Sequence, residues 1–139
     1  MTPAHRGSIA VLLLRLVTGV AFLFHGWGKI QDPMHWMDKA PNHPPGFLQA
    51  LAAVAEFGGG LGLIIGLLTP LCCAGIFCTM AFATYVHVSR GDPFVAKGGG
   101  GSYELAAAYL TIVLSIALLG PGRYSVDQRI AGRRVPNDY

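Results

Sequence analysis

Residues 47–88 read FLQALAAVAEFGGGLGLIIGLLTPLCCAGIFCTMAFATYVHV, and Glu56 is the one Asp, Glu, Lys or Arg residue among them. The stretch contains two apolar runs, 47–68 and 71–88, each of about the length that crosses a bilayer as a helix. They meet at a very short turn. Thr69 can cap the second helix, and Pro70 fits its first turn because a proline there loses no hydrogen bond. The stretch therefore predicts two antiparallel membrane-spanning helices.

Two further apolar runs, at about residues 9–30 and 103–119, flank this pair. The chain of 139 residues is 53% hydrophobic and 12% charged, and this charged fraction is about half of that in soluble domains. Run 9–30 is too long for a signal peptide and carries Arg15, so we expect a true span. Spanning segments must be helical, because lipid cannot satisfy backbone polar groups. We therefore expect an all-α fold, in which residues 1–139 form a single transmembrane four-helix bundle with both termini on one side.

The few basic residues outside the spans predict the orientation. The net charge of +3 is too small to indicate a nucleic-acid partner. Lys and Arg favour the cytoplasmic side, and the side with the termini has the larger number of them by a thin margin: Arg6, Arg123, Arg129, Arg133 and Arg134 against Lys39, Arg90 and Lys97, with Lys29 at the edge of its span on the second side. Both termini are thus expected in the cytoplasm. In residues 124–134, Val126 and Ile130 stand at helical spacing among arginines, which favours a short interfacial helix.

Ionisable side chains within or at the edge of the spans suggest a site, because each is costly in lipid. They are Arg15, His25, Lys29, Glu56, His87 and Glu104. Glu56 is the deepest, about 14 Å from the loop side at 1.5 Å per residue. All except Arg15 fall in the loop-bearing half, which predicts a polar pocket there. Arg15 is expected to form a structural ion pair with Glu56. The alternative is that these groups are interhelical contacts or residues that reach the membrane interface.

The residue types of this pocket indicate what it could bind. Two histidines and two carboxylates are transition-metal ligands, but they are scattered over four helices without a close pair, so no metal site is predicted. The same groups in apolar surroundings suit a quinone, whose carbonyls they could hydrogen-bond and whose protons they could carry. Tyr103 could form part of the wall.

Gly58, Gly62 and Gly66 repeat at four-residue spacing in the second run. Small residues at this spacing let two helix backbones approach closely in a membrane. The repeat predicts either an internal packing seam or the contact surface of a homodimer.

The ordered set of these motifs resembles the DoxX family of small bacterial four-helix membrane proteins. The resemblance covers nearly the whole chain and rests on Leu13-Leu14-Arg15, His25-Gly26-x-x-Lys29, Ala55-Glu56-x-x-Gly59-Gly60, His87, Lys97-Gly98-Gly99, Tyr103-Glu104 and Gly120-Pro121-Gly122-Arg123-Tyr124-Ser125. It implies a protein of the bacterial cytoplasmic (inner) membrane. Relatives are linked to quinone-dependent oxidation, including a membrane subunit of a thiosulfate:quinone oxidoreductase, and to redox or electrophile stress. The chain departs from the family in its long glycine run and its Pro- and Met-rich first loop.

We therefore expect a membrane subunit of a quinone-linked oxidoreductase. Its ligand would be a quinone or a similar small redox molecule, bound on the loop side by His25, Lys29, Glu56, His87, Tyr103 and Glu104. The alternative is a non-catalytic anchor or assembly subunit of a larger redox or stress-response complex. Other protein subunits are expected partners in both cases, and catalysis by this chain alone is an open question. A carrier function is disfavoured, because no inverted repeat or broken helix is evident.

Overall fold

The chain folds into α-helices in the computed structural model, which describes residues 2–40 and 43–131. The helices are α1 (Pro3–Gln31), α2 (Gly46–Ile65), α3 (Thr69–Ser89), α4 (Glu104–Leu119) and the short α5 (Val126–Ile130). No strand occurs in these two ranges, so the all-α prediction is confirmed for the described part of the chain. α5 lies inside the segment for which an interfacial helix is expected, whereas residues 132–134 of that segment are outside the described residues.

Three helices are long and apolar enough to cross a membrane: α1, α2 and α3. α4 is apolar but has 16 residues, which at 1.5 Å each is about 24 Å against a hydrocarbon core of about 30 Å. Three of the four predicted spans are thus confirmed as span-length helices. The spanning role of α4, and with it the transmembrane four-helix bundle, stays a prediction.

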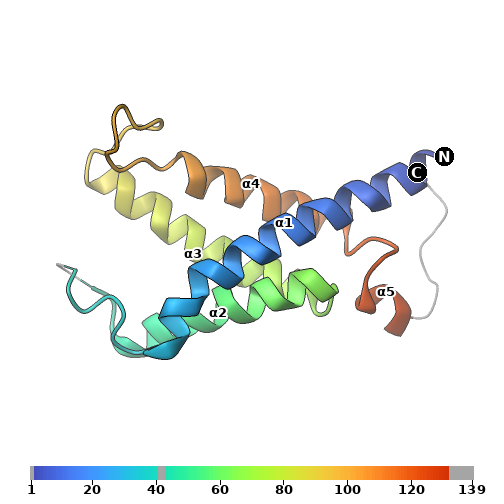
Figure 1. Cartoon of the computed structure of the whole chain (residues 1–139), viewed down its shortest axis with the longest axis horizontal. Helices are drawn as coiled ribbons and strands as arrows, with labels where there is room; N and C mark the ends of the chain where they lie inside the picture. Colours follow the sequence, from blue (N-terminus) through green and yellow to red (C-terminus); the bar gives the residue numbers. More distant parts are fainter. Residues whose placement is uncertain (1, 41–42, 132–139) are drawn as a thin grey trace.

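Neighbours in sequence are neighbours in space, since α1 packs on α2, α2 on α3 and α3 on α4, and α1 also contacts α4. A small core joins them, with Phe22, Leu63, Ile76, Val113 and Ile116 all fully buried. Figure 1 shows α2 and α3 close together at their connecting turn and diverging toward the opposite end, where the α1–α2 and α3–α4 loops lie. We call that end the loop end.

Glycines let α1 and α2 approach each other closely. A side chain added at Gly60 would meet the backbone of Gly19 and Leu23 at 2.8 Å, and one added at Gly26 would collide with the backbone of Phe57. These contacts also show that α1 and α2 are antiparallel, with Gly19 facing Gly60 and Gly26 facing Phe57.

The end opposite the loops is tied together by polar contacts, and we call it the turn end. The Asp127 carboxylate of α5 accepts the backbone N–H groups of Leu68 and Thr69, at 2.7 and 2.8 Å, in the α2–α3 turn. At the start of α1, the rings of His5 and Tyr124 pack edge to face. The start of α1, the α2–α3 turn and the segment after α4 therefore lie together.

Candidate functional site

A pocket lies at the loop end, in the gap that α2 and α3 leave as they diverge. It has a volume of about 640 Å³, which is within the range of small-molecule sites. Its walls are mostly apolar and come mainly from Leu51, Ala52 and Ala55 of α2 and Met80, Phe82, Ala83 and Val86 of α3. Polar side chains that line it include Lys29, Gln49, Glu56, His87 and Arg90.

Glu56 and Lys29 form an ion pair in the pocket wall. Lys29 Nζ lies 2.7 and 2.6 Å from the two carboxylate oxygens of Glu56. The Glu56 side chain is 3% exposed and that of Lys29 is 25% exposed, so the carboxylate is buried while the lysine is partly exposed. Lys29 also lies 4.4 Å from the centre of the Trp36 ring, in a cation–π contact. The pair neutralises a carboxylate that would otherwise be very costly to bury.

The helical repeat explains why Glu56 faces inward. Gln49, Ala53, Glu56, Gly60 and Leu63 are all buried and follow one another at intervals of three or four residues, so they form a single stripe on α2. Glu56 is therefore a polar position within a core-facing stripe.

Arg15 does not pair with Glu56, so that prediction is corrected. Its fully buried guanidinium donates to the carbonyl oxygens of Leu63, Ile64, Pro121 and Tyr124, at 2.8–3.2 Å. The reason is the register between α1 and α2. Lys29 is the residue of α1 that lies opposite Glu56, and Arg15 lies 14 residues before Lys29, about 21 Å along the helix. Arg15 thus meets the carboxyl end of α2, where free carbonyls attract a cation.

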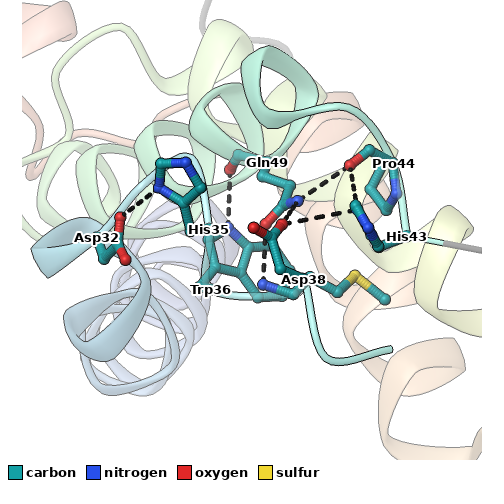
Figure 2. Close-up of polar contacts among 8 residues, drawn as sticks. Asp32, His35, Trp36, Asp38, His43, Pro44 and Gln49 are labelled. Atoms are coloured by element: carbon teal, nitrogen blue, oxygen red, sulfur yellow. Dashed lines mark hydrogen bonds and ion pairs between the residues drawn. The ribbon is translucent and has the colours of Figure 1, made fainter. Parts of the chain in front are cut away.

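The α1–α2 loop is attached to α2 through Gln49, as Figure 2 shows. The Gln49 amide accepts the backbone N–H of Met37 at 2.8 Å and donates to Asp38 and to the carbonyl of Pro44 at 2.8 and 3.0 Å. The Trp36 indole N–H donates to the backbone carbonyl of Gln49 at 3.0 Å. Nearby in the loop, His35 contacts Asp32, and this hydrogen bond raises the pKa of His35. The loop is thereby held over the pocket, with Trp36 in its wall.

His87 lines the α3 side of the pocket and contacts a carboxylate. Its Nδ1 lies 2.7 Å from Oδ2 of Asp92, and the two side chains are 32% and 25% exposed. Arg90 also lines the pocket. The pocket therefore carries polar groups on both sides, from α1 and α2 on one and from the end of α3 on the other.

The structure brings three of the six predicted ligand-binding residues together: Lys29, Glu56 and His87. His25 is exposed on α1 and packs against Phe22 and Tyr109, with ring centres 5.7 and 6.2 Å apart. Tyr103 packs on Phe94 in the α3–α4 loop, and Glu104 is exposed at the start of α4. None of these three residues lines the pocket: among the described residues, Lys29 is the one that α1 contributes to the lining, and Tyr103 and Glu104 lie in the α3–α4 segment, which contributes none beyond Arg90.

The predicted glycine repeat does not form one seam. Gly58 is exposed, Gly62 faces Cys72 of α3, and Gly66 ends α2 with a left-handed φ of 70° beside Arg15 and Ser125. The close approach of α1 and α2 uses Gly19, Gly26 and Gly60 instead.

The sequence reasoning missed Gln49, Arg90 and Asp92 as residues of this region. Gln49 could have been found, because it is a polar residue seven positions before Glu56 on the same helix stripe. Cys78, Thr79 and Gly75 also line the pocket, but no sequence pattern marks them. Within the described residues, no three His, Cys, Asp or Glu side chains converge in a way that could hold a metal ion.

Comparisons with known proteins agree on one family. A family model described as DoxX matches residues 10–89, more than half of the chain. The chain is 32% identical to the inner membrane protein YqjF of Escherichia coli in an alignment of 133 positions, which covers 87% of this chain and 92% of that protein. It is 27% identical to an uncharacterized membrane protein of Mycobacterium tuberculosis, with 91% of this chain and 85% of the relative covered. An uncharacterized protein of Haemophilus influenzae is 30% identical over 84% of this chain and 87% of its own length. No solved structure matches the chain.

Proposed function

The chain belongs to the DoxX family of membrane proteins, and from this membership and the pocket we propose that it is a membrane subunit of a quinone-linked oxidoreductase. The ligand is a quinone or a similar small redox molecule bound between α2 and α3. Since the Escherichia coli relative is named an inner membrane protein, the proposed location is the bacterial inner membrane.

The observation that carries this proposal is the combination of an apolar pocket with a buried ion pair in its wall. The pocket lies beside exposed apolar side chains of α2 and α3, including Leu48, Leu51 and Phe82. In a membrane these side chains face lipid, so a lipid-soluble ligand can enter sideways between the helices. The polar groups of the pocket are suited to hold a quinone head and its apolar walls to hold the ring substituents.

The proposal is tested by the binding of ubiquinone-1, a short-chain quinone, to the purified protein in lipid nanodiscs. Calorimetric titration against empty nanodiscs separates site binding from partition into lipid. An Ala83→Phe variant fills the pocket and is expected to weaken binding at least about tenfold, or 1.4 kcal/mol. Ala117→Phe places the same ring on an exposed position of α4 and is the matched control.

Two results would contradict the proposal. One is the absence of saturable binding to the unmodified protein, and the other is equal affinity of the Ala83→Phe variant and the unmodified protein. Thermal unfolding of both variants shows whether a loss of binding is a loss of folding.

We also propose that α4 crosses the membrane, which makes a four-helix bundle with both termini in the cytoplasm. The contact between His5 and Tyr124 supports this arrangement, because it brings the start of α1 and the segment after α4 to the same end. The excess of arginine near both termini supports the cytoplasmic side.

A second candidate function is a non-catalytic anchor or assembly subunit of a larger redox or stress-response complex. The observation that favours it is the first loop, in which Gln49 binds Met37 and Asp38 while side chains such as Met34 and His35 are exposed. Exposed side chains on a loop tied to a helix are suited to bind another subunit. Under this alternative, Ala83→Phe leaves the function of the complex intact, whereas Gln49→Leu releases the loop and reduces assembly.

Homodimerisation is a further form of this alternative, for which the exposed Gly58 offers a flat surface on α2.

A further inference from the structure

The contact between His87 and Asp92 is built by the way α3 ends. The backbone N–H of Asp92 donates to the carbonyl of His87, and that of Gly91 donates to the carbonyl of Val88, both at 3.0 Å. This pair of bonds is the Schellman motif, which needs a left-handed residue after the helix. Gly91 supplies it, with a φ of 77°. The motif turns the chain back so that Asp92 lies beside the last turn of α3.

In this motif the residue in the position of Asp92 often makes an apolar contact with the residue in the position of His87. Here the contact is polar, with 2.7 Å between Nδ1 and Oδ2. A carboxylate can only accept, so in a neutral His87 ring the proton stands on Nδ1 and donates to Asp92. Nε2 is then left without a proton and acts as an acceptor. His87 lines the pocket, and Nε2 has no hydrogen-bond partner among the described residues.

We propose that Asp92 is a positioning residue that makes His87 a hydrogen-bond acceptor of the pocket, so that the site prefers a ligand with a hydroxyl group, the reduced quinol, over the oxidised quinone. A quinol hydroxyl donates to Nε2, whereas a quinone oxygen meets a second acceptor there. This inference rests on the proposed function, because it assumes a ligand between α2 and α3.

The other charged groups of the pocket leave this role to His87. Lys29 is bound to Glu56, and both lie on the far wall, on α1 and α2. The guanidinium of Arg90, which directly follows α3, can only donate hydrogen bonds and so cannot act as the acceptor. Lys97 shares with Asp92 a second pocket, formed by the α3–α4 loop.

Gly101, one residue of the glycine run in that loop, lies against the Asp92 side chain and leaves no room for a larger residue. A Cβ atom added there would lie 2.7 Å from Oδ2 and 3.0 Å from Cγ of Asp92. Since the obstacle is the end of a side chain, Gly101→Ala displaces the carboxylate without moving a helix. Gly100 has no atom within 4 Å of the same position and no left-handed φ. Gly100→Ala is therefore a matched control one residue away.

The first test reads the ring directly, by ¹⁵N NMR of histidine-labelled protein in nanodiscs at mildly alkaline pH. His87→Gln identifies the signals of His87, and the other histidines report that the fold is intact. We expect the Nδ1–H tautomer in the unmodified protein and in Gly100→Ala. Asp92→Ala and Gly101→Ala are expected to restore the Nε2–H tautomer common in water. An Nε2–H tautomer in the unmodified protein, or no change in Gly101→Ala, overturns the inference.

The second test compares the dissociation constants of ubiquinol-1 and ubiquinone-1. The unmodified protein is expected to bind the quinol about tenfold more tightly, a typical effect of one hydrogen bond against an unpaired group. Asp92→Ala and Gly101→Ala lose this ratio, and Gly100→Ala keeps it. Equal affinities of the unmodified protein for the two molecules overturn the preference for the quinol. If neither molecule binds, the proposed function is overturned. The NMR experiment needs no ligand, so its result is independent of both outcomes.

Discussion

The charged side chains Glu56 and Arg15, which are buried, and Asp127, which is half-buried, have partners of different kinds. Glu56 is neutralised by one lysine, whereas Arg15 has no carboxylate among its hydrogen-bond partners and donates to four backbone carbonyls. Asp127 accepts two backbone N–H groups. Free backbone groups at helix ends thus take up charges for which the core has no counter-ion. Two of these arrangements make predictions at the scale of single residues.

Breaking the Lys29–Glu56 pair is expected to cost more than removing it. Lys29→Met leaves a buried carboxylate alone and should lower the free energy of unfolding by about 2–4 kcal/mol, somewhat less than a fully buried pair because Lys29 is partly exposed. The double variant Lys29→Met, Glu56→Leu should recover most of this loss, since no charge is left without a partner. Unfolding in mixed micelles measures both, and Lys39→Met in the exposed part of the first loop is the control. A double variant as unstable as the sum of the single ones contradicts the pairing.

The contribution of Asp127 is expected to depend on pH. Burial raises the pKa of Asp127, but hydrogen bonds from the N–H groups of Thr69 and Leu68, together with the charge of Arg15, outweigh it and hold that pKa below 3.8. Because the folded pKa is lowered, the stabilisation is complete above the unfolded value and is lost as the pH falls through the folded value.

Asp127→Asn should therefore be less stable than the unmodified protein at neutral pH, by about 1 kcal/mol as for other helix caps. The difference should shrink once the pH falls below 3.8. Thermal unfolding of the variant and of the unmodified protein as a function of pH measures it. A difference that does not change with pH argues against the cap.

At the scale of elements, the pairing of α1 with α2 depends on where glycines fall on each helix. Hydropathy predicts the existence and approximate length of these helices, because those properties are local. It does not predict rotation about the helix axis, and for this reason the repeat Gly58, Gly62, Gly66 was a plausible seam while the contact in fact uses Gly60. Neighbouring residues on a helix point about 100° apart. His25 and Lys29 show a different limit, because residues four apart share a helix face. His25 nevertheless packs against Tyr109 of α4, whereas Lys29 reaches Glu56 of α2.

Two alanine substitutions two residues apart on α2 should have opposite effects. Gly60→Ala places a methyl group 2.8 Å from the backbone of Gly19 and Leu23, which cannot move unless the helices separate. We expect a loss of about 1–3 kcal/mol, as for other overpacked sites. Gly58→Ala is exposed and has only Val54 of its own helix nearby, at 3.9 Å. It should gain up to about 1 kcal/mol from helix propensity. Unfolding of both variants in the same micelles tests the register, and equal effects would contradict it.

At the scale of the whole molecule, the sequence predicts where charges lie along the membrane normal better than it predicts their partners. Depth follows from counting residues at 1.5 Å each, so Glu56, His87 and Lys29 were correctly assigned to the loop end. Partners depend on the register between helices that are far apart in sequence. Arg15 illustrates this, because its contacts with Pro121 and Tyr124 join residues more than a hundred positions apart. A polar pocket at the loop end was predicted from these ionisable groups, but its place between α2 and α3 was not, since it results from the divergence of these two helices.

The number of spans can be decided by the location of the two ends of the chain. An even number of crossings puts both termini on one side of the membrane, whereas three crossings by α1, α2 and α3 alone put them on opposite sides. The packing of His5 on Tyr124 and the bond between Asp127 and the α2–α3 turn place the segment after α4 at the turn end. α4 starts at the loop end, where the N–H of Glu104 donates to Phe94. α4, which has 16 residues, and the segment that follows it therefore connect the two ends together.

We accordingly expect green fluorescent protein to fluoresce when fused to either terminus of the chain in a bacterial inner membrane, because it folds only on the cytoplasmic side. Alkaline phosphatase, which is active only outside the cytoplasm, should be active when inserted at Lys39 or Lys97, the two loops of the loop end. The insertion at Lys39 is the internal control, since both arrangements place that loop on the same side relative to α1. An active phosphatase and a dark fluorescent protein at the carboxyl terminus would mean that α4 does not cross, and the contact of Tyr124 with His5 could then not persist in the membrane.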